Sequence, residues 1–534
     1  MIDLSAHGLI APNSPPARPA GPGTVARLLD AMLDETPDRL ALVGRSARYT
    51  VAELDAAAQL AASTLSSLGV QPGDRVGVSL PNDADVVVTV LGAMRLGAVW
   101  VGINRSLAAP EKAYMLRDAG VRVMLGDSTA CAQIEALRNE LPELTDVIKV
   151  DPGTAENPWG DLMADAEPDP VDVAIDPFTP GAIAYTSGTT GFPKGAVHTQ
   201  HNMLMPGAVS AFGGAYPDDA VLGVALPLTI LNLIILGPLM AYQNGVTLVA
   251  MDRVDAVGMA EWIEAEQIST FSAVPAMVHD LLSHTEVEQS QLRSLSAIGV
   301  GGADMPDAFR RMYQKRFNTP VGTGYGLTEA PTAVTVEDPT IKPIANTCGK
   351  ALPQVQVHIV DENDQLLGAG EVGEVCVGPA IDGPFAVMYR PMLGYWNRPE
   401  ASAEALRGGL LHTADMGMLD GQGNLYIKDR RKDLIIRGGA NVYPAEVERV
   451  LHESPDVTAC AVIGKPDDRL GERVVAFVQT SDGSTVTAES LRTLCIANLA
   501  LYKIPDDITF VDDFERTPMG KIRKGPLRDS TSAT

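Results

Sequence analysis

Apolar positions recur along the chain at two spacings, one typical of helices and one of buried strands. Helical spacing occupies residues 24–36, 51–68 and 86–96, and short Val-rich runs occupy 75–80, 99–103 and 121–125. The same rhythm resumes with a strand at 247–250, a helix at 257–266 and a strand at 270–274. Such alternation is typical of mainly parallel sheets covered by helices. It predicts an α/β fold whose large N-terminal domain contains two similar α/β lobes.

The pattern changes beyond Cys348. Short alternating strands at 355–360, 374–377 and 425–428 predict a small β-barrel-like subdomain, in which the GxGxxG at 368–373 is a hairpin turn. From Leu434 onward, helices at 445–452 and 489–499 and strands at 457–463 and 473–479 predict a small α+β domain. The charged run DRRKD at 429–433 marks the boundary. We therefore expect an N-terminal arm at 1–23, mobile because of its prolines, a large domain at 24–428 and a small domain at 434–534.

No charged residue occurs between Ala220 and Met251. Proline, glycine and amide residues interrupt this stretch, and the remaining apolar runs are shorter than the ~20 residues that a membrane span needs. A buried helix and strand are the favoured interpretation, so no stable membrane insertion is expected.

Length and composition exclude several classes of function. A chain of 534 residues is too long for one hydrophobic core, and a net charge of −26 argues against nucleic acid as a partner. The five cysteines are widely spaced and include no CxxC pair, and the N-terminus lacks the features of a signal peptide. These observations favour a cytoplasmic protein without disulfides or zinc. A homodimer is compatible with the sequence.

The stretch from Ala184 to His201 has the composition of a phosphate cradle. Its glycines let the backbone approach a ligand, its hydroxyls donate hydrogen bonds, and Lys194 adds a compact positive charge. The cradle residues are Thr186, Ser187, Gly188, Thr189, Thr190, Gly191 and Lys194. Pro193 and Gly195 stand where a Walker A motif needs glycine and a hydroxyl, so the P-loop class is excluded.

The run YTSGTTGFPKG resembles the signature of the acyl-adenylate-forming superfamily, which includes acyl- and aryl-CoA synthetases, peptide-synthetase adenylation domains and firefly-type luciferases. The resemblance covers residues 24 to about 524. It implies an AMP-forming acid–thiol ligase that uses ATP, Mg²⁺ and coenzyme A. Adenylation of the acid and thioester formation would follow one another in one active centre, with a mobile C-terminal domain turning about a hinge at 429–433.

Further motifs resemble those of the family and imply roles for individual residues. YGLTE resembles the family's YGxTE motif, which implies that Tyr325 stacks on adenine beside Gly326, that Thr328 touches the α-phosphate and that Glu329 holds Mg²⁺ with Thr190. The remaining nucleotide and hinge positions implied are Gly301, Gly302 and Ala303 at adenine, Asp415 and Arg430 at the ribose, and Lys432 at the hinge. Ala414 and Asp429 replace glycines that are customary there. The run RGGANVYP resembles the loop lining the pantetheine tunnel, with Gly438, Gly439 and Asn441 as its contacts, and Lys521 matches the catalytic lysine of the last motif.

The family often carries P-L-F-H before its acyl pocket, whereas this chain has Pro227-Leu228-Thr229-Ile230. The apolar, uncharged residues there predict a neutral apolar acid, such as a medium-chain, alicyclic or aryl acid. His198 and His201 lack a third ligand nearby and are interpreted as non-metal residues. Three alternatives stay open at this level: an enzyme that loads a separate carrier protein, a luciferase-like oxygenase, and an inactive nucleotide-binding relative. The presence of Lys194, Glu329, Asp415 and Lys521 together argues against the last.

Overall fold

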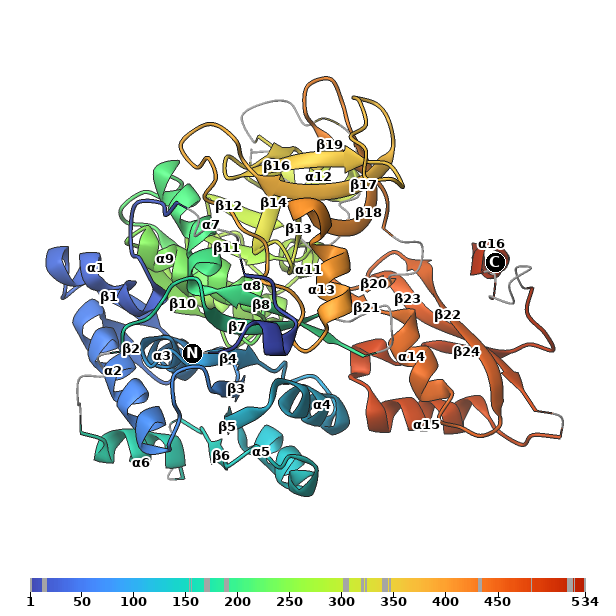
Figure 1. Cartoon of the computed structure of the whole chain (residues 1–534), viewed down its shortest axis with the longest axis horizontal. Helices are drawn as coiled ribbons and strands as arrows, with labels where there is room; N and C mark the ends of the chain where they lie inside the picture. The colour runs from blue at the N-terminus through green and yellow to red at the C-terminus, as the bar shows by residue number, and fades with distance from the viewer. Residues whose placement is uncertain are drawn as a thin grey trace.

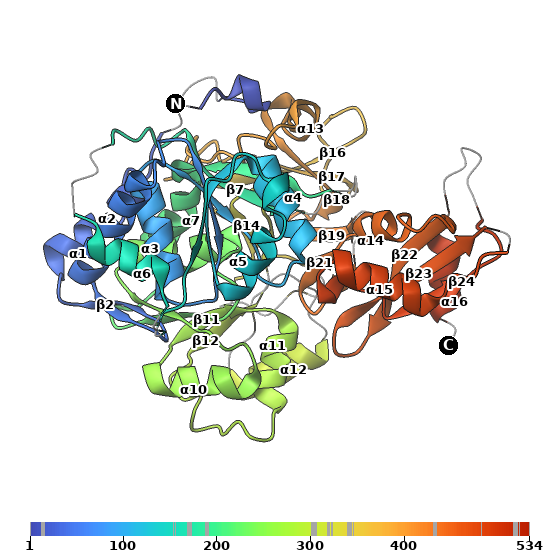
Figure 2. The ribbon, with the colours of Figure 1, turned by 90° about the horizontal axis from the view of Figure 1, so that it is seen from below.

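The computed structural model in Figure 1 describes residues 2–11, 17–152, 154, 156–167, 173–186, 192–300, 307–317, 321, 324–338, 344, 347–430, 435–481, 483–515, 522 and 524–532. A large body built around two six-stranded sheets fills one side of the molecule, and the C-terminal residues form a separate small domain beside it (Figure 2). The predicted α/β class with a small α+β C-terminal domain is confirmed.

The first sheet has the order β12-β11-β9-β10-β1-β2 and is parallel except for its edge strand β2. Its strands are β1 (Leu40–Val43), β2 (Arg48–Thr50), β9 (Val221–Val224), β10 (Thr247–Ala250), β11 (Thr270–Ala273) and β12 (Ala297–Val300). Helices α1 (Asp30–Glu35), α10 (Ala256–Glu266), α11 (Pro275–Ser283) and α12 (Asp307–Phe317) belong to this lobe. The run predicted as a strand at 247–250 matches β10 to the residue.

The second sheet has the order β6-β5-β3-β4-β7-β8, again parallel with one antiparallel edge, β8. Its strands are β3 (Arg75–Ser79), β4 (Val99–Gly102), β5 (Val121–Gly126), β6 (Asp146–Lys149), β7 (Pro180–Thr186) and β8 (Lys194–Thr199). Its helices are α2 (Val51–Ser67), α3 (Ala84–Arg95), α4 (Ala109–Ala119), α5 (Ser128–Glu135), α6 (Pro158–Asp165) and α7 (Gln200–Phe212). Residues of α2 and α3 join both sheets in one hydrophobic cluster. Gly92 permits the close approach of these helices, because a Cβ there would lie 2.6 Å from that of Ala61. Two similar lobes were predicted, and this arrangement confirms them.

The uncharged stretch at 220–251 is more broken than the expected single helix and strand. Between β9 and β10 it contains α8 (Leu231–Ile234), a π-helical turn (Ile235–Leu239) and α9 (Met240–Gln243). Pro238 lies inside the turn and has no N–H to donate, which favours local departure from α-helical bonding. No helix in the described part of the chain is long and apolar enough to span a bilayer.

An antiparallel unit follows, as predicted for the barrel-like subdomain. Its strands are β13 (Gly324–Leu327), β14 (Thr332–Val336) and β15 (Lys350–Ala351) in one sheet, and β16 (Val355–Val360), β17 (Gly373–Pro379), β18 (Leu411–Leu419) and β19 (Leu425–Arg430) in another, with α13 (Pro399–Ala405) between β17 and β18. The GxGxxG run connects the antiparallel neighbours β16 and β17, and Glu371 accepts the N–H of Gly368 there. The prediction of a turn is confirmed.

The C-terminal domain packs two helices on one sheet. The sheet contains β20 (Ile435–Arg437), β21 (Ala440–Val442), β22 (Val457–Asp467), β23 (Gly471–Thr480) and β24 (Asp507–Phe510). Helices α14 (Pro444–Leu451) and α15 (Ala488–Asn498) lie in its core cluster, and α16 (Lys524–Ser532) follows. The proposed hinge at 429–433 lies largely outside the described residues.

The N-terminal arm differs from the expectation. The His7 ring stacks on Trp396 at 3.9 Å between centroids, Leu9 is buried, and the Ile10 N–H donates to the Leu393 carbonyl at 2.8 Å. The description of residues 1–23 as a mobile arm is therefore wrong for residues 7–10. Proline-rich composition indicates only that regular elements are absent, whereas this stretch is held by a loop almost 400 residues away.

Candidate active site

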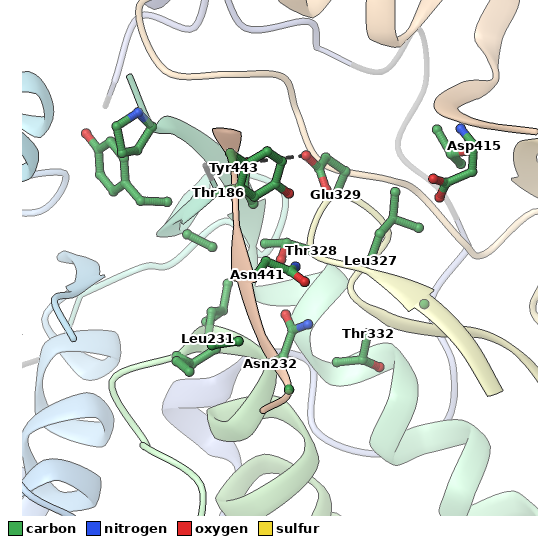
Figure 3. Close-up of a pocket in the computed structure, with 18 of the residues that line it drawn as sticks. Thr186, Leu231, Asn232, Leu327, Thr328, Glu329, Thr332, Asp415, Asn441 and Tyr443 are labelled. Carbon is green, nitrogen blue, oxygen red and sulfur yellow. Dashed lines mark hydrogen bonds between the residues drawn. The ribbon is translucent and has the colours of Figure 1, made fainter. Parts of the chain in front are cut away.

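An open cavity of about 2550 Å³ lies where the large and small domains meet. Its walls include the ends of β7 and β8, the turn after β13, the middle of β18 and the β20–β21 turn. Figure 3 shows Thr186, Thr328, Glu329, Asp415 and Asn441 around this space, with Leu231 and Asn232 on another wall. Residues from five separate segments thus share one site.

Glu329 is held by two hydroxyl groups. The Tyr395 hydroxyl donates to Glu329 Oε1 at 2.8 Å, and the Thr186 hydroxyl lies 3.4 Å from the same oxygen. Burial and the Glu329 carboxylate raise the pKa of Tyr395, so this phenol stays protonated and donates. Among the hydrogen bonds of the described residues, none involves Glu329 Oε2. Mg²⁺ binds carboxylate oxygens, so this oxygen is a candidate ligand for the ion. The donor set fits a magnesium ion that would neutralise charge on phosphate oxygens.

Sequence reasoning missed Tyr395. It lies 66 residues beyond Glu329, in a loop that adds to the edge of β8: its backbone bridges to Ala196, and the Trp396 N–H donates to the Gly195 carbonyl at 2.8 Å. The same loop brings the Tyr395 ring to 5.0 Å from the Lys194 ammonium, a cation–π distance. No local pattern in the sequence predicts the contact of Tyr395 with Glu329 or with Lys194.

One end of the cavity is formed by a bulge in β18. Pairing with β17 jumps from Cys376–His412 to Glu374–Met416, which leaves residues 413–415 out of the ladder. Bulges of this kind re-aim side chains next to active sites. Here the bulge brings Asp415 to the cavity, where its Oδ2 accepts the Tyr325 hydroxyl at 2.5 Å. The backbone of Arg430 pairs with Asp415 across β18 and β19.

The backbone conformation of Ala414 is one that favours glycine, the residue that is customary at this position. Its φ is 59°, in the left-handed region, which costs a residue with a Cβ about 1–2 kcal/mol. The conformation is held by Glu374, whose Oε1 accepts the Ala414 N–H at 2.9 Å. Burial raises the pKa of Glu374, but hydrogen bonds from His412, Arg407 and Ala414 outweigh it and lower the pKa overall. The carboxylate therefore stays charged and supports the bulge.

The β20–β21 turn brings the C-terminal domain into the cavity. Gly438 and Gly439 have φ values of 58° and 83°, which a two-residue hairpin turn of this type requires. A Cβ at Gly439 would lie 2.5 Å from Val274 of the large domain. The two glycines thus serve the turn and the close approach of the domains, in addition to any passage for a thiol arm.

His198 is fully buried behind Thr328. Its Nε2 lies 2.8 Å from the Thr328 carbonyl, which can only accept, so this nitrogen carries the proton. Burial lowers the pKa of His198 to about 4, although the bond to Thr328 opposes the shift. His201 similarly lies 2.8 Å from the Met388 carbonyl. Both histidines hold backbone near the site.

Several predicted residues lie outside the described part of the chain: Ser187, Gly188, Thr189, Thr190, Gly191, Gly301, Gly302, Ala303, Lys432 and Lys521. The Arg430 side chain is likewise not described. Among the others, Thr186, Lys194, Tyr325, Gly326, Thr328, Glu329, Asp415, Gly438, Gly439 and Asn441 all line the one cavity. Their individual roles stay predictions.

Comparison with known proteins assigns the chain to a family. Residues 29–396 match the family described as AMP-binding enzyme, and residues 446–521 match the AMP-binding enzyme C-terminal domain. The chain belongs to the AMP-binding enzyme family. The superfamily resemblance of the sequence is thereby confirmed, and relatives that are CoA ligases at 34% identity support the conclusion that the protein is an AMP-forming acid–thiol ligase.

Relatives and solved structures of this family extend over nearly the whole chain. The long-chain-fatty-acid–CoA ligase FadD13 of Mycobacterium tuberculosis is 34% identical over 96% of this chain and 97% of its own length. The indoleacetate–CoA ligase of Aromatoleum aromaticum is 34% identical over 89% of this chain and 92% of its own. The structure of o-succinylbenzoate CoA synthetase (MenE) from Bacillus subtilis, bound with its product analogue OSB-NCoA, superposes with a TM-score of 0.83 and 29% identity over 95% of this chain and 98% of that one.

Replacing Tyr395 by phenylalanine tests the orientation of Glu329. Hydrogen bonds to charged groups contribute about 1.5–3 kcal/mol, so Tyr395→Phe should slow adenylation by about 10- to 100-fold. ATP–pyrophosphate exchange measures this step. An exchange rate equal to that of the wild type would show that the phenol does not support the carboxylate.

His198 should make stability depend on pH. Its pKa is about 4 in the folded chain against 6.5 for an ordinary histidine, so the unfolded chain binds the extra proton first as pH falls. The wild type should lose about 3 kcal/mol from this group between pH 6.5 and pH 4. His198→Gln retains a donor for Thr328 and does not titrate, so its melting temperature should fall less steeply over that range. Parallel melting curves would contradict a neutral buried imidazole.

Proposed function

We propose that this protein is an ATP- and Mg²⁺-dependent carboxylic acid–CoA ligase whose acid is neutral and largely apolar. The observation that carries the proposal is that one cavity is lined by the YGLTE turn, by an apolar wall and by the 438–441 turn of the small domain. The first fits phosphoryl transfer, the second the acyl group and the third the thiol arm. Relatives that are CoA ligases of fatty and aromatic acids support this division.

The first half-reaction joins a carboxylate oxygen to the α-phosphorus and breaks the bond to pyrophosphate. Negative charge gathers on phosphoryl oxygens in this step, and Lys194 and the hydroxyls of Thr186 and Thr328, which line the cavity, would stabilise it. Asp415 would accept the ribose hydroxyls, exchanging its bond with Tyr325 for them. Glu329 would hold the magnesium ion.

The second half-reaction joins the CoA sulfur to the acyl carbon, and AMP leaves. The described orientation of the small domain suits this step, because Gly438, Gly439 and Asn441 face the cavity. The likeness to MenE, over both domains and with a product analogue bound in that protein, supports the same assignment. Adenylation would need the other orientation, reached by rotation about 429–433 with Lys432 as hinge, which brings Lys521 to the phosphates.

The wall expected to bind the acyl group contains no charged residue in segments 226–240, 272–277 and 299–300. Leu231, Leu236, Met240 and Met277 supply apolar surface, and Ile230 is partly exposed to the space. Burial of each methylene is worth about 0.8 kcal/mol, or roughly fourfold in rate. A dicarboxylate would leave its second charge without a partner on this wall. A screen of acids by pyrophosphate release, with and without CoA, tests the function directly.

Lys521 should matter in one half-reaction only. If this lysine stabilises phosphoryl charge during adenylation, Lys521→Ala should slow pyrophosphate exchange by about 100-fold or more. Supplied acyl-adenylate should still be converted to acyl-CoA at the wild-type rate. An equal loss in both measurements would contradict the division between the two orientations.

Gly299 should limit the size of the acyl group. A Cβ at this position of β12 meets only Ser272 Oγ at 3.7 Å and the Phe271 carbonyl at 3.8 Å, so it is accommodated without a clash, and the methyl groups of a valine should narrow the cavity that Gly299 lines. Gly299→Val should lower kcat/KM for the best long acid by about tenfold or more, the cost of losing two methylenes, and leave acetate and propionate unchanged. Gly421→Val, in an open turn remote from the cavity, is the control. Unchanged chain-length preference in Gly299→Val would place the acyl group elsewhere.

A further inference from the structure

Three charged side chains meet in a buried cluster across the contact between the domains. Lys503 Nζ lies 2.7 Å from Glu111 Oε1 and 3.0 Å from Glu446 Oε2. The three side chains are only 4%, 10% and 3% exposed. Lys503, on a 3-10 turn at 501–503, and Glu446, on α14, belong to the small domain, whereas Glu111 lies on α4 of the large domain. Burial lowers the pKa of Lys503, but the charges around it outweigh burial and raise that pKa, so the lysine is charged.

The cluster is rigidly connected to the turn that enters the cavity. Arg437, the last residue of β20, donates to the carbonyls of Tyr502 at 3.0 Å and Ile504 at 3.3 Å, on either side of Lys503. Its other nitrogen lies 2.6 Å from Asp506. Glu446 follows the end of β21 by four residues. Arg437 at the start of the 437–443 segment and Glu446 just after its end therefore both contact the 502–504 segment that carries Lys503.

The large domain presents Glu111 in a fixed position. Glu111 Oε2 accepts the Ala108 N–H at 2.9 Å at the start of α4, which leaves Oε1 to receive Lys503. Both ribbon views place α4 on the side of the large domain that faces α14 and α15 (Figures 1 and 2). A second contact lies on the same face, where the Arg449 guanidinium sits 4.5 Å above the Phe192 ring. Phe192 in turn stacks on Tyr114 of α4 at 5.1 Å.

We propose that Lys503 and Glu111 are positioning residues that hold the small domain in the thioester-forming orientation. The inference rests on the proposed function. It assigns the Lys503–Glu111 ion pair to the thioester-forming orientation alone. Because the partners belong to different domains, rotation of the small domain breaks the 2.7 Å contact and withdraws the 437–443 segment together with Lys503. Glu446 remains beside Lys503 after rotation, since both lie in the small domain. The lysine is then never left without a carboxylate, which keeps the rotation reversible.

Glu111→Gln removes the charge and retains an amide oxygen for the Ala108 N–H, so α4 keeps its first turn. CoA should bind the thioester-forming orientation. Its apparent affinity is therefore lower when a smaller fraction of the enzyme is in that orientation. We expect the KM for CoA in thioester formation from supplied acyl-adenylate to rise about tenfold or more, the scale of a lost buried ion pair. The rate of pyrophosphate exchange should stay within about twofold, since adenylation uses the other orientation. Glu140→Gln, which removes a half-exposed partner of Arg117, on the same helix α4 as Glu111, is the matched control and should change neither measurement.

A double-mutant cycle tests the pair from the other domain. Lys503→Met retains the aliphatic stem and removes the charge, and it should raise the KM for CoA as Glu111→Gln does. If the two residues act through each other, the double variant is no worse than the more affected single variant. Additive effects of the two substitutions would contradict a direct pair, even if either single variant proved unstable.

The outcomes separate this proposal from the proposed function. A wild-type enzyme that forms no thioester with any acid would contradict the function before the variants are measured. An active wild type with an unchanged KM for CoA in Glu111→Gln, or with equal losses in both half-reactions, would contradict the positioning role alone.

Discussion

The chemistry of this protein depends on the close contact between its two domains, because neither domain encloses the cavity alone. The large domain supplies Glu329, Lys194 and Asp415, and the small domain supplies the turn at Gly438 and Gly439. Contact is so close that a single methyl group at Gly439 would meet Val274 at 2.5 Å. Any movement of the small domain therefore changes the composition of the site, and one cavity can serve two steps that need different groups.

Charge must be concentrated locally in a chain that carries a net charge of −26. Several cations near the cavity are fixed by carboxylates or carbonyls: Arg407 by Glu374 and Asp364, and Arg437 by Asp506. Lys194 instead lies over an aromatic ring, which attracts the ammonium without neutralising it. This arrangement leaves Lys194 able to meet an anion despite the excess negative charge elsewhere on the chain.

Local sequence patterns predicted the elements well where burial alone shapes them. The strands at 247–250 and 355–360 were predicted with their exact bounds, since short β-branched runs bounded by turn residues have few alternatives. The motifs likewise pointed to residues that line the cavity, through their resemblance to a known family and not through any periodicity. Contacts between distant segments could not be predicted in this way. Tyr395 meets Glu329 across 66 residues and Lys503 meets Glu111 across 392, and no periodicity carries that information. The π-helical turn near Pro238 and the docking of His7 on Trp396 also depend on neighbours distant in the sequence.

The left-handed conformation of Ala414 has a consequence for the order in which the protein loosens on heating. Strain of about 1–2 kcal/mol is retained there only as long as Glu374 holds the bulge. Segments of this kind open locally at a lower free energy than the sheets that support them. A nucleotide bound to Asp415 would add its binding free energy to the closed bulge. This end of the cavity would then become ordered by the bound nucleotide, and exchange of backbone amides at 413–415 would report occupancy of the site.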